Sequence, residues 1–472
     1  MKDDRPLWQL SASSIAALIA DGTVSSAEVT RAAIDRMKQV NPALNAIVDA
    51  LCEEAIKEAN ELDCQMARSG PVGPLHGVPI TIKQNTDQAG RATPNGVTAF
   101  KDNIASEDSP IVCNFKRAGA VIIGRTNTPE FSFRATTANA LYGRTLNPWN
   151  DWATAGGSSG GAASAVMSGM CALSHGNDLS GSLRFPAAAA GAASIKPGLG
   201  RTPAYNSSAS VERGILSQIM VVQGVIAREV RDLRLAMGTL IQYDPHDPWM
   251  VKQTSEGESL ERPIKVAFTR DTFEFDLHPA VETALETARY ALTEAGYAVT
   301  ETTLPDIRKV SEEMWRALLG EVNILLGPDI EAYGSETFKS VYANYLELFR
   351  PYHGEALIAA MARRSHHVRA WQLFLQEFPL VLTPFMPHPT LAWDRDAQGK
   401  DGVMEMQGAS IYAGAINYLG LPAGCVPARF NEGLPIGIQI IGRRFREDLI
   451  IDACEAIEKR VGVMAEKLFE RL

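Results

Sequence analysis

Two adjacent serines lie between two glycine pairs in residues 155–161, which read AGGSSGG. Glycine loses more backbone freedom on folding than any other residue, so four glycines in six positions indicate unusual backbone angles or a close approach by another group. A loop that holds the hydroxyl groups of Ser158 and Ser159 in so tight a backbone is a candidate reaction centre. The alternative interpretation of the same composition is a flexible linker.

Two residues outside this loop could act with its serines. Lys83 ends the apolar run of residues 78–82, and Ser182 follows Ser158 by 24 positions in the small-residue segment GNDLSGSLRFPAAAAG. Taken alone, a lysine at a strand end is usually a solvated charge, and a serine among small residues usually belongs to a turn. Taken together, these residue types suggest one mechanism.

A lysine and two serines can form a hydrolytic site. A serine hydroxyl is a weak nucleophile near neutral pH and needs an adjacent base. Lysine becomes that base when a dry pocket and donated hydrogen bonds stabilise its neutral amine and lower its pKa from about 10.4 by several units. A second serine hydroxyl both donates and accepts, so it can relay the proton. Backbone N–H groups of a glycine–serine loop can then stabilise an oxyanion.

Histidine is the competing base. The chain has eight histidines, among them His175, seven residues before Ser182, and the pair His366 and His367. The sequence has no H-E-x-x-H zinc motif, no phosphate-binding loop and no S-x-x-K motif. GGSSG matches the G-x-S-x-G nucleophile elbow around Ser158. That elbow follows a buried strand, however, and the preceding NPWNDWATA does not read as one.

Composition narrows the class of protein. The 472 residues are 46% apolar and 21% charged, the balance of a globular protein with a large core. The net charge of −10 is not that of a nucleic-acid-binding protein, which typically carries an excess of lysine and arginine. The N-terminus lacks the apolar region of a signal peptide, and no apolar run reaches the roughly 18 residues of a membrane span. Six scattered cysteines without C-x-x-C pairs argue against zinc and disulfides, so we expect a reducing, cytoplasmic location.

Helices and short apolar strands alternate along the chain. Residues 25–40 open with serine capping signals and Glu28 in the first turn, which predicts a helix, and residues 51–67 repeat that pattern. Apolar runs at residues 78–82 and 120–123 predict buried strands, and similar runs occur in PIKVAFTRD, PLVLTPFMP and LPIGIQIIGRR. This order predicts a single α/β domain with a largely buried mixed sheet.

We expect four consecutive parts in this domain. Residues 1–70 would be a helical segment packed on the core, and residues 71–235 the core with the glycine–serine loop. Residues 236–375 would continue the α/β pattern with a variable helical cover over about 300–375, rich in aromatic residues and histidine. Residues 376–472 would complete the same core. The cover is either an ordinary helical layer or a lid that shapes a pocket.

Several long segments resemble the amidase signature family of serine hydrolases. AGGSSGGAASAVMSGM and HGNDLSGSLRFPAAAAGAASIKPGLGRTP resemble its signature region, and PLHGVPITIKQN resembles the segment that carries its catalytic lysine. GRTNTPEFSF and LYGRTLNPWN resemble its lead-in to the glycine–serine loop, and INYLGLPAGCVPA and GLPIGIQIIGRRFREDLIIDACEAIE resemble its C-terminal strands and helix. The resemblance runs from about residue 8 to about residue 460 and implies a large mixed, mostly parallel β-sheet flanked by helices.

The resemblance also implies a catalytic triad. Ser182 would be the nucleophile, Ser158 would relay the proton and follow a cis peptide bond, and Lys83 would be the terminal base. The implied oxyanion donors are the backbone N–H groups of Leu179, Ser180, Gly181 and Ser182. The implied supporting residues are Ser159, Asn177, Asp178 and Arg184. No metal or organic cofactor is expected.

Three positions depart from the family pattern. Ser180 stands where the family usually has glycine or alanine, which can narrow the acyl pocket while keeping the N–H donors. Asn177 and His175 replace the more usual threonine and apolar residue, and the resulting HGND variant points to small-amide and lactam-type hydrolases. We expect His175 to be a packed, hydrogen-bonded residue and not a catalyst.

The resemblance implies an amidase that hydrolyses a carboxylic amide C–N bond through an acyl-serine intermediate. Its expected partner is a small-molecule amide, with no nucleic acid or membrane partner and with a homodimer as a possibility. One alternative is the amidase component of a glutamine-dependent aminoacyl-tRNA amidotransferase, which works with partner chains, and another is a non-catalytic binding protein on the same fold. Aryl, aliphatic, cyclic and peptide amides all remain open. We expect specificity to come from about 300–375 and from loops near Tyr142, Phe385 and Tyr412.

Overall fold

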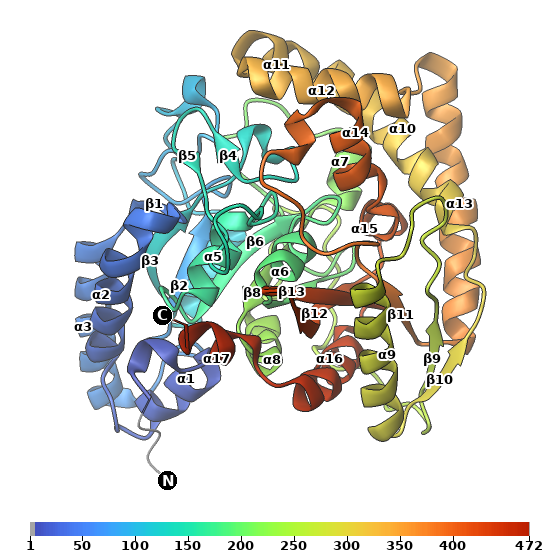
Figure 1. The fold of residues 1–472 in the computed structure, drawn as a ribbon. Coiled ribbons are helices and arrows are strands. Elements are labelled where there is room, and N and C mark those ends of the chain that lie inside the picture. Colours follow the sequence, from blue (N-terminus) through green and yellow to red (C-terminus); the bar gives the residue numbers. More distant parts are fainter. Residues whose placement is uncertain (1–4, 472) are drawn as a thin grey trace.

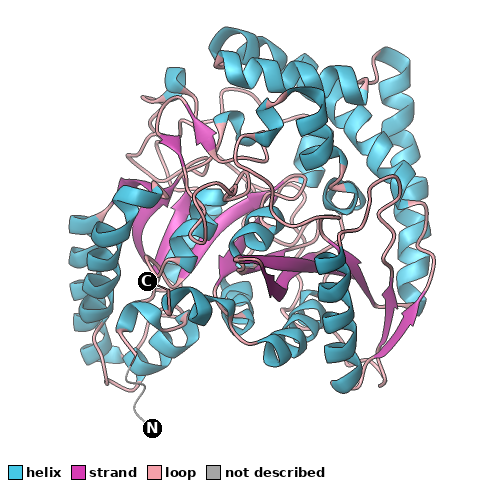
Figure 2. Ribbon diagram, viewed as in Figure 1, coloured by secondary structure: helices cyan, strands magenta, loops and turns pink. Residues whose placement is uncertain are grey.

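The computed structural model describes residues 5–471. In this part of the chain, eleven strands form one continuous sheet in the order β1-β3-β2-β6-β8-β7-β12-β13-β11-β9-β10, with helices packed around it (Figure 1, Figure 2). β4 and β5 form a separate two-stranded ribbon. The expected single α/β domain with a mixed sheet flanked by helices is therefore confirmed.

The strands are short, and most of them are buried. They are β1 (Ile47–Ala50), β2 (Pro79–Lys83), β3 (Val121–Thr126), β4 (Ala138–Asn139), β5 (Gly143–Arg144), β6 (Leu173–Asp178), β7 (Ala193–Lys196), β8 (Val222–Ala227), β9 (Lys265–Phe268), β10 (Ala298–Glu301), β11 (Leu380–Pro384), β12 (Ala423–Asn431) and β13 (Leu434–Gly442).

The helices range from one turn to more than six turns. They are α1 (Ala12–Ala20), α2 (Ser26–Leu44), α3 (Cys52–Ser69), α4 (Pro110–Arg117), α5 (Gly160–Met167), α6 (Arg184–Ala190), α7 (Ile215–Met220), α8 (Val230–Leu240), α9 (Pro279–Glu294), α10 (Ile307–Leu325), α11 (Gly327–Tyr333), α12 (Glu336–Phe349), α13 (Gly354–Glu377), α14 (Gly399–Val403), α15 (Ile411–Leu419), α16 (Glu447–Val461) and α17 (Met464–Phe469). Among the residues described, no helix combines the length and apolarity needed to cross a membrane.

Strand direction follows the length of the connections. β2 pairs in parallel with β3 and β6, and β9 pairs in parallel with β10 and β11, each across a connection that contains a helix. β12 and β13 are antiparallel and form a hairpin whose turn residues, Glu432 and Gly433, have φ of 49° and 86°. Of the ten strand pairs described for this sheet, four are parallel, so antiparallel pairs make up more of it than the resemblance implied.

The sheet separates two apolar cores, because successive residues of a strand point to opposite faces. On β8, Val225 and Ala227 join the core beneath α8, α9 and α16, whereas Ile226 joins the core beneath α5 and α6. With both faces covered, all five residues of β2 are buried, including Lys83 at its end. A charged side chain at this point therefore lies inside the protein and not in solvent.

The elements that the sequence predicts around residues 25–126 are present. α2 begins with a capping box in which the Ser25 hydroxyl accepts from the Glu28 N–H at 3.1 Å and the Glu28 carboxylate accepts from the Ser25 N–H at 2.8 Å. The predicted strands at residues 78–82 and 120–123 correspond to β2 and β3. β6 is not predicted, because its sequence LSHGND lacks an apolar run or an alternating pattern.

Helices α10 to α13 form the expected helical cover along one end of the sheet (Figure 1). Their apolar side chains build a further core together with α15. Within it, Trp315 of α10 stacks on Phe349 of α12 with ring centroids 4.7 Å apart. α10 also packs directly on α15, so the cover is held against the part of the chain that precedes the β12–β13 hairpin.

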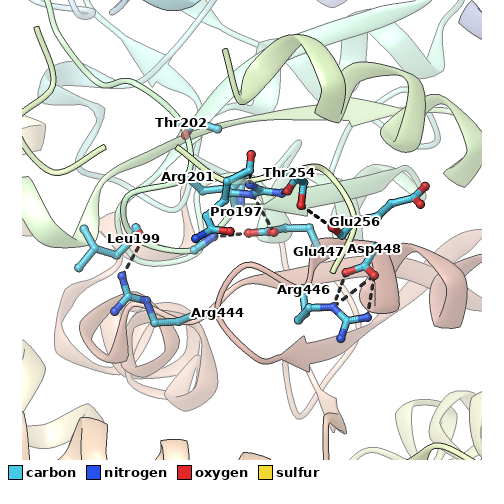
Figure 3. Close-up of polar contacts among 12 residues, drawn as sticks. Pro197, Leu199, Arg201, Thr202, Thr254, Glu256, Arg444, Arg446, Glu447 and Asp448 are labelled. Atoms are coloured by element: carbon cyan, nitrogen blue, oxygen red, sulfur yellow. Dashed lines mark hydrogen bonds and ion pairs between the residues drawn. The ribbon is translucent and has the colours of Figure 1, made fainter. Parts of the chain in front are cut away.

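A buried ion pair fixes the segment after β7 to the start of α16 (Figure 3). Arg201 Nε lies 3.0 Å from Glu447 Oε2, and both side chains are 1% exposed. The Gly198 N–H donates to the other carboxylate oxygen at 3.0 Å. The guanidinium of Arg201 also donates to the carbonyls of Gln253 and Thr254 at 3.2 and 2.6 Å. Each buried charge thus has several partners, which offsets the cost of removing it from water.

The first turn of α5 packs directly on the backbone beside β1 and β3. A Cβ atom on Gly161 would lie 2.5 Å from the Asn127 N and 2.7 Å from the Ala46 carbonyl oxygen. Neither neighbour is a flexible side chain, so neither can move aside at low cost. Glycine at this position therefore lets the helix that follows the serine pair approach the sheet.

We predict that Gly161→Ala lowers the free energy of unfolding by about 2 kcal/mol, because the added methyl overpacks a backbone contact. Chemical denaturation of the purified protein measures this change. The matched control is Gly238→Ala in α8, where an added Cβ meets no atom within 4 Å. That change should leave stability equal or raise it by about 0.5–1 kcal/mol. Equal effects of the two substitutions would contradict the packing argument.

Candidate active site

The carboxyl ends of two neighbouring parallel strands bring Lys83 and Asn177 together. β2 and β6 pair in parallel, with Ile80 opposite Leu173 and Thr81 opposite Ser174. Because parallel strands end at the same edge, Lys83 at the end of β2 lies beside the last residues of β6. Lys83 is completely buried. The sequence identified Lys83 as a candidate residue, and the pairing of β2 with β6 shows which residues surround it.

The ammonium group of Lys83 has three hydrogen-bond acceptors. Lys83 Nζ lies 2.7 Å from Ser158 Oγ, 3.0 Å from Ser159 Oγ and 2.9 Å from Asn177 Oδ1. Burial lowers the pKa of this amine from 10.5 to about 7, although the carboxylate of Asp178 acts in the opposite direction. The structure thus joins three of the residues expected from the sequence to a lysine that can be neutral near physiological pH.

The loop that carries the two serines has the backbone expected of it. The peptide bond between Gly157 and Ser158 is cis, and Gly156 has φ of 78°. A Cβ atom on Gly157 would collide with the carbonyl of Arg134. The Thr137 hydroxyl holds the loop from outside, donating to the Gly156 carbonyl at 2.8 Å and accepting from the Gly160 N–H at 3.1 Å. The expectation of a cis bond before Ser158 is confirmed.

Ser182 lies in the short turn between β6 and α6. The carboxylate of Asp178 shapes this turn by accepting from the N–H groups of Gly181 and Leu183 at 2.7 and 3.0 Å. Burial alone would raise the pKa of Asp178, but the guanidinium of Arg184 outweighs it and holds this pKa well below its ordinary value. Asp178 is therefore ionised and acts as a fixed template for the serine turn.

Arg184 and Asp178 form an ion pair with both side chains 0% exposed, at 3.0 Å between Nη2 and Oδ1. The guanidinium also donates to Gln439 Oε1 at 2.7 Å and to Asn417 Oδ1 at 2.5 Å. These partners lie on β13 and α15, so the ion pair ties the turn of Ser182 to the C-terminal part of the chain. The residues expected to support the site are thus connected to it through hydrogen bonds.

The backbone N–H groups around Ser182 divide into two sets. That of Gly181 is taken by Asp178, so it is not free to bind a substrate oxygen. Those of Leu179, Ser180 and Ser182 make no hydrogen bond within the described residues. The Ser182 carbonyl accepts from the Ser159 N–H at 3.3 Å, which places the two serine segments in contact. No hydrogen bond between the Ser182 and Ser158 hydroxyls is present in this part of the chain.

A pocket has Ser182 among its lining residues. Its floor contains residues 179–182 and Gly157. Aromatic rings also line it, and they come from Phe133, Phe185, Trp315, Tyr345 and Phe385. Phe185 and Phe385 stack with centroids 6.1 Å apart. Aromatic side chains therefore lie around the serine turn, together with the polar residues Arg134 and Gln407.

Helices α10 and α12 contribute to this pocket, since Trp315 comes from α10 and Tyr345 from α12. Of the three regions expected to set specificity, those near Phe385 and Tyr412 line the pocket, the second through Ser410 and Ala413. Tyr142 and Tyr412 are not among its lining residues. The Tyr412 hydroxyl donates to the Asp271 carbonyl at 2.9 Å.

Polar groups at one wall of the pocket were not anticipated by the sequence. Gln407 Nε2 donates to the Tyr345 hydroxyl at 2.9 Å, and both residues line the pocket. Burial raises the pKa of Tyr345, so its hydroxyl keeps its proton. Gln407 belongs to a single π-helical turn, Met404–Gly408, and no sequence pattern in this chain marks it as a pocket residue.

His175 is a packed residue, as expected. Its Nε2 lies 2.9 Å from Gln223 Oε1, and its Nδ1 accepts from the Lys83 backbone N–H at 3.4 Å. Burial lowers its pKa to about 3, so the ring is neutral, with the proton on Nε2 in the assignment that fits both contacts. Within residues 5–471, no group of three or more histidine, cysteine or acidic side chains is arranged to hold a metal ion.

Comparison with known proteins shows the family of the chain. A family model described as Amidase matches residues 28–451. The chain is 46% identical over 474 residues to an indoleacetamide hydrolase of Bradyrhizobium diazoefficiens, covering 99% of this chain and 89% of that protein. It is 29% identical over 480 residues to one component of the glutamyl-tRNA(Gln) amidotransferase of Moorella thermoacetica, covering 96% and 97%. The crystal structure of a bacterial aryl acylamidase of the amidase signature family matches with a TM-score of 0.85 at 26% identity, covering 98% of this chain and 99% of that chain.

We predict that Arg184→Met lowers the free energy of unfolding by about 3 kcal/mol or more, because it leaves the Asp178 carboxylate buried without its guanidinium. Denaturant titration measures the loss. The matched control is Arg308→Met, which removes an ion pair with Glu274 whose side chains are 41% and 46% exposed. That change should cost less than about 1 kcal/mol. Similar losses in both variants would show that Arg184 does not act through its buried partner.

Proposed function

The chain belongs to the Amidase family of amide-hydrolysing enzymes, and we propose that its substrate is an arylacetamide, a primary amide joined to an aromatic ring through one methylene group. Hydrolysis of its C–N bond would give the carboxylate and ammonia. One observation carries the hydrolytic part of this proposal: a completely buried lysine amine lies 2.7 Å from a serine hydroxyl beside the pocket floor.

Two observations support an aromatic acyl group. The pocket above Ser182 has five aromatic side chains in its walls, and rings packed edge to face or in offset stacks favour a planar partner. A related protein that aligns with nearly the whole chain is an indoleacetamide hydrolase, and a matching solved structure is an aryl acylamidase. The Tyr345–Gln407 pair adds polar groups at the wall, which suit a ring with a polar edge.

In the proposed mechanism, Lys83 acts as a neutral base. A neutral amine has two N–H donors and one lone pair, whereas three acceptors surround this nitrogen. Ser159 Oγ and Asn177 Oδ1 would keep the two N–H groups, so the lone pair faces Ser158 and accepts its proton. Ser158 in turn accepts the proton of Ser182 when substrate brings the two hydroxyls into contact.

The Ser182 oxygen would then attack the amide carbon. The free N–H groups of Leu179, Ser180 and Ser182 would stabilise the oxyanion, with the Gly181 N–H retained by Asp178. The proton held by Lys83 returns through Ser158 to the leaving nitrogen, so the C–N bond breaks and ammonia departs. Water then attacks the acyl-serine along the same proton path, which regenerates Ser182 and releases the carboxylate.

We further propose that the enzyme works in the cytoplasm and without a nucleic-acid partner. The net charge of −10 and six free cysteines support this assignment. A homodimer is compatible with it.

The two alternative functions differ from this proposal in what they require. The amidase component of an amidotransferase needs partner chains, and the relative of that kind is less similar to this chain than the indoleacetamide hydrolase. A non-catalytic binding protein has no need for a lysine amine buried against two serines, which costs stability. The arrangement around Lys83 therefore favours a catalyst.

We predict that the purified chain alone hydrolyses phenylacetamide and indole-3-acetamide faster than acetamide, and that Ser182→Ala lowers the rate by about 10³-fold or more. Ammonia release measures the reaction, and a fluorophosphonate probe should label the wild-type chain at Ser182. Activity in the Ser182→Ala variant would contradict the nucleophile assignment. A preference for acetamide would contradict the substrate class, and activity only with added partner chains would favour the amidotransferase.

We predict that kcat/KM rises as pH increases through about 7 and then levels off, because Lys83 must lose its proton before it can accept one from Ser158. Below pH 7 the loss should approach tenfold per pH unit. Lys196 is the matched control, since burial also lowers its pKa to about 7 but its amine contacts the Pro197 carbonyl. Lys196→Met should keep the same midpoint. A rate that is constant between pH 5 and 8 would contradict the role of Lys83.

A further inference from the structure

We propose that Asn85 is a positioning residue for Lys83: it holds the carboxamide of Asn177 with its oxygen toward the lysine amine, and so directs the lysine lone pair at Ser158. The inference rests on the proposed function, because it concerns the base of that reaction. Asn85 lies two residues after Lys83, beyond the end of β2, and no catalytic or supporting role was expected for it from the sequence.

The two asparagines form a reciprocal amide pair. Asn85 Nδ2 donates to Asn177 Oδ1 at 3.2 Å, and Asn177 Nδ2 donates to Asn85 Oδ1 at 2.8 Å. Asn177 Oδ1 also accepts from Lys83 Nζ at 2.9 Å, so both of its lone pairs are used. Asn177 cannot rotate its carboxamide without breaking three hydrogen bonds at once.

The orientation of Asn177 matters because Lys83 has only donors when charged. If the carboxamide turned over, the Asn177 NH₂ would face the lysine ammonium, and buried donors would lack acceptors, at a cost of about 1–3 kcal/mol each. When Lys83 is neutral, an amide NH₂ at this place would instead attract the lone pair away from Ser158. The Ser159 hydroxyl donates to the Asn177 backbone carbonyl at 3.4 Å. With the amide oxygen also facing Lys83, the Ser158 hydroxyl is the proton donor left for the lone pair.

Asn85 is itself oriented by a wall of the substrate pocket. Its Nδ2 donates to Ser132 Oγ at 2.9 Å, and the Ser132 hydroxyl donates to Asn95 Oδ1 at 2.6 Å. Because Ser132 gives its proton to Asn95, its oxygen is an acceptor toward Asn85, which fixes the NH₂ end of Asn85. Ser132 lines the pocket. A directed chain of hydrogen bonds therefore runs from the pocket wall through both asparagines to the base.

A role in positioning differs from a role in packing, and two substitutions separate them. Asn85→Asp keeps the size of the side chain but removes the NH₂ that donates to Asn177 Oδ1 and places a carboxylate near Lys83. A nearby negative charge favours the ammonium form, so the midpoint of kcat/KM should move to higher pH by about one unit or more. Asn85→Ala removes the whole pair and should lower kcat about tenfold or more at its pH optimum, with KM changed less than twofold.

Asn206→Ala is the matched control. Asn206 Nδ2 donates to the backbone carbonyl of Asn85 at 2.8 Å, and its Oδ1 accepts from the Asp87 N–H at 3.1 Å. This variant loosens the same loop without touching the carboxamide chain. It should leave the midpoint of the pH profile where it is in the wild type, whatever its effect on stability.

The experiment measures pH profiles of kcat and KM for the wild type and the three variants, with thermal unfolding as a check on folding. The expected result is an upward shift for Asn85→Asp, a kcat loss for Asn85→Ala and no shift for Asn206→Ala. An unshifted profile in Asn85→Asp, or an equal shift in Asn206→Ala, overturns the inference. If Asn85→Asp does not fold, an unchanged kcat in Asn85→Ala overturns it. Absence of Ser182-dependent hydrolysis in the wild type would instead overturn the proposed function.

Discussion

The arrangement around Lys83 follows from the burial of an amine where bulk water does not reach it. A charged amine is costly to bury unless each of its N–H groups has an acceptor, and here Ser158, Ser159 and Asn177 provide three. The same burial lowers the pKa to about 7, so the feature that costs stability also makes the group a base. The buried environment of Lys83 therefore lowers the stability of the protein and also sets the proton affinity of the amine. Such shifted pKa values are common at functional sites.

The acceptors of Lys83 come from separate parts of the chain, and groups that do not react hold them in place. Thr137 fixes the serine loop through its backbone, and the ionised Asp178 shapes the turn that carries Ser182. Arg184 links that turn to β13 and α15, and Asn85 orients the amide that faces the lysine. In the proposed mechanism, substrate binding brings the Ser182 hydroxyl toward Ser158.

The sequence predicted residues whose type is required by chemistry or by backbone shape. The end of an apolar run identified Lys83, and glycine spacing with the family resemblance identified Ser158, its cis peptide bond and Ser182. Contacts that depend on strand register could not be predicted from the sequence. β6 has no apolar pattern, and only its pairing with β2 places Asn177 beside Lys83. Asn85 lies in the turn that follows β2, and no periodic pattern of the sequence places its side chain against Asn177. The capture of the Gly181 N–H by Asp178 and the pocket position of Gln407 depend on tertiary packing that no local pattern encodes.

The proton affinity of Lys83 can be measured directly by NMR titration of the chain labelled with ¹³C at the lysine ε-carbons. Two resonances should titrate near pH 7, one from Lys83 and one from Lys196, and Lys196→Met should remove the second. The account predicts that the remaining resonance has a midpoint near 7 and disappears in Lys83→Met. A Lys83 resonance that titrates near the ordinary value of about 10.4 would contradict it.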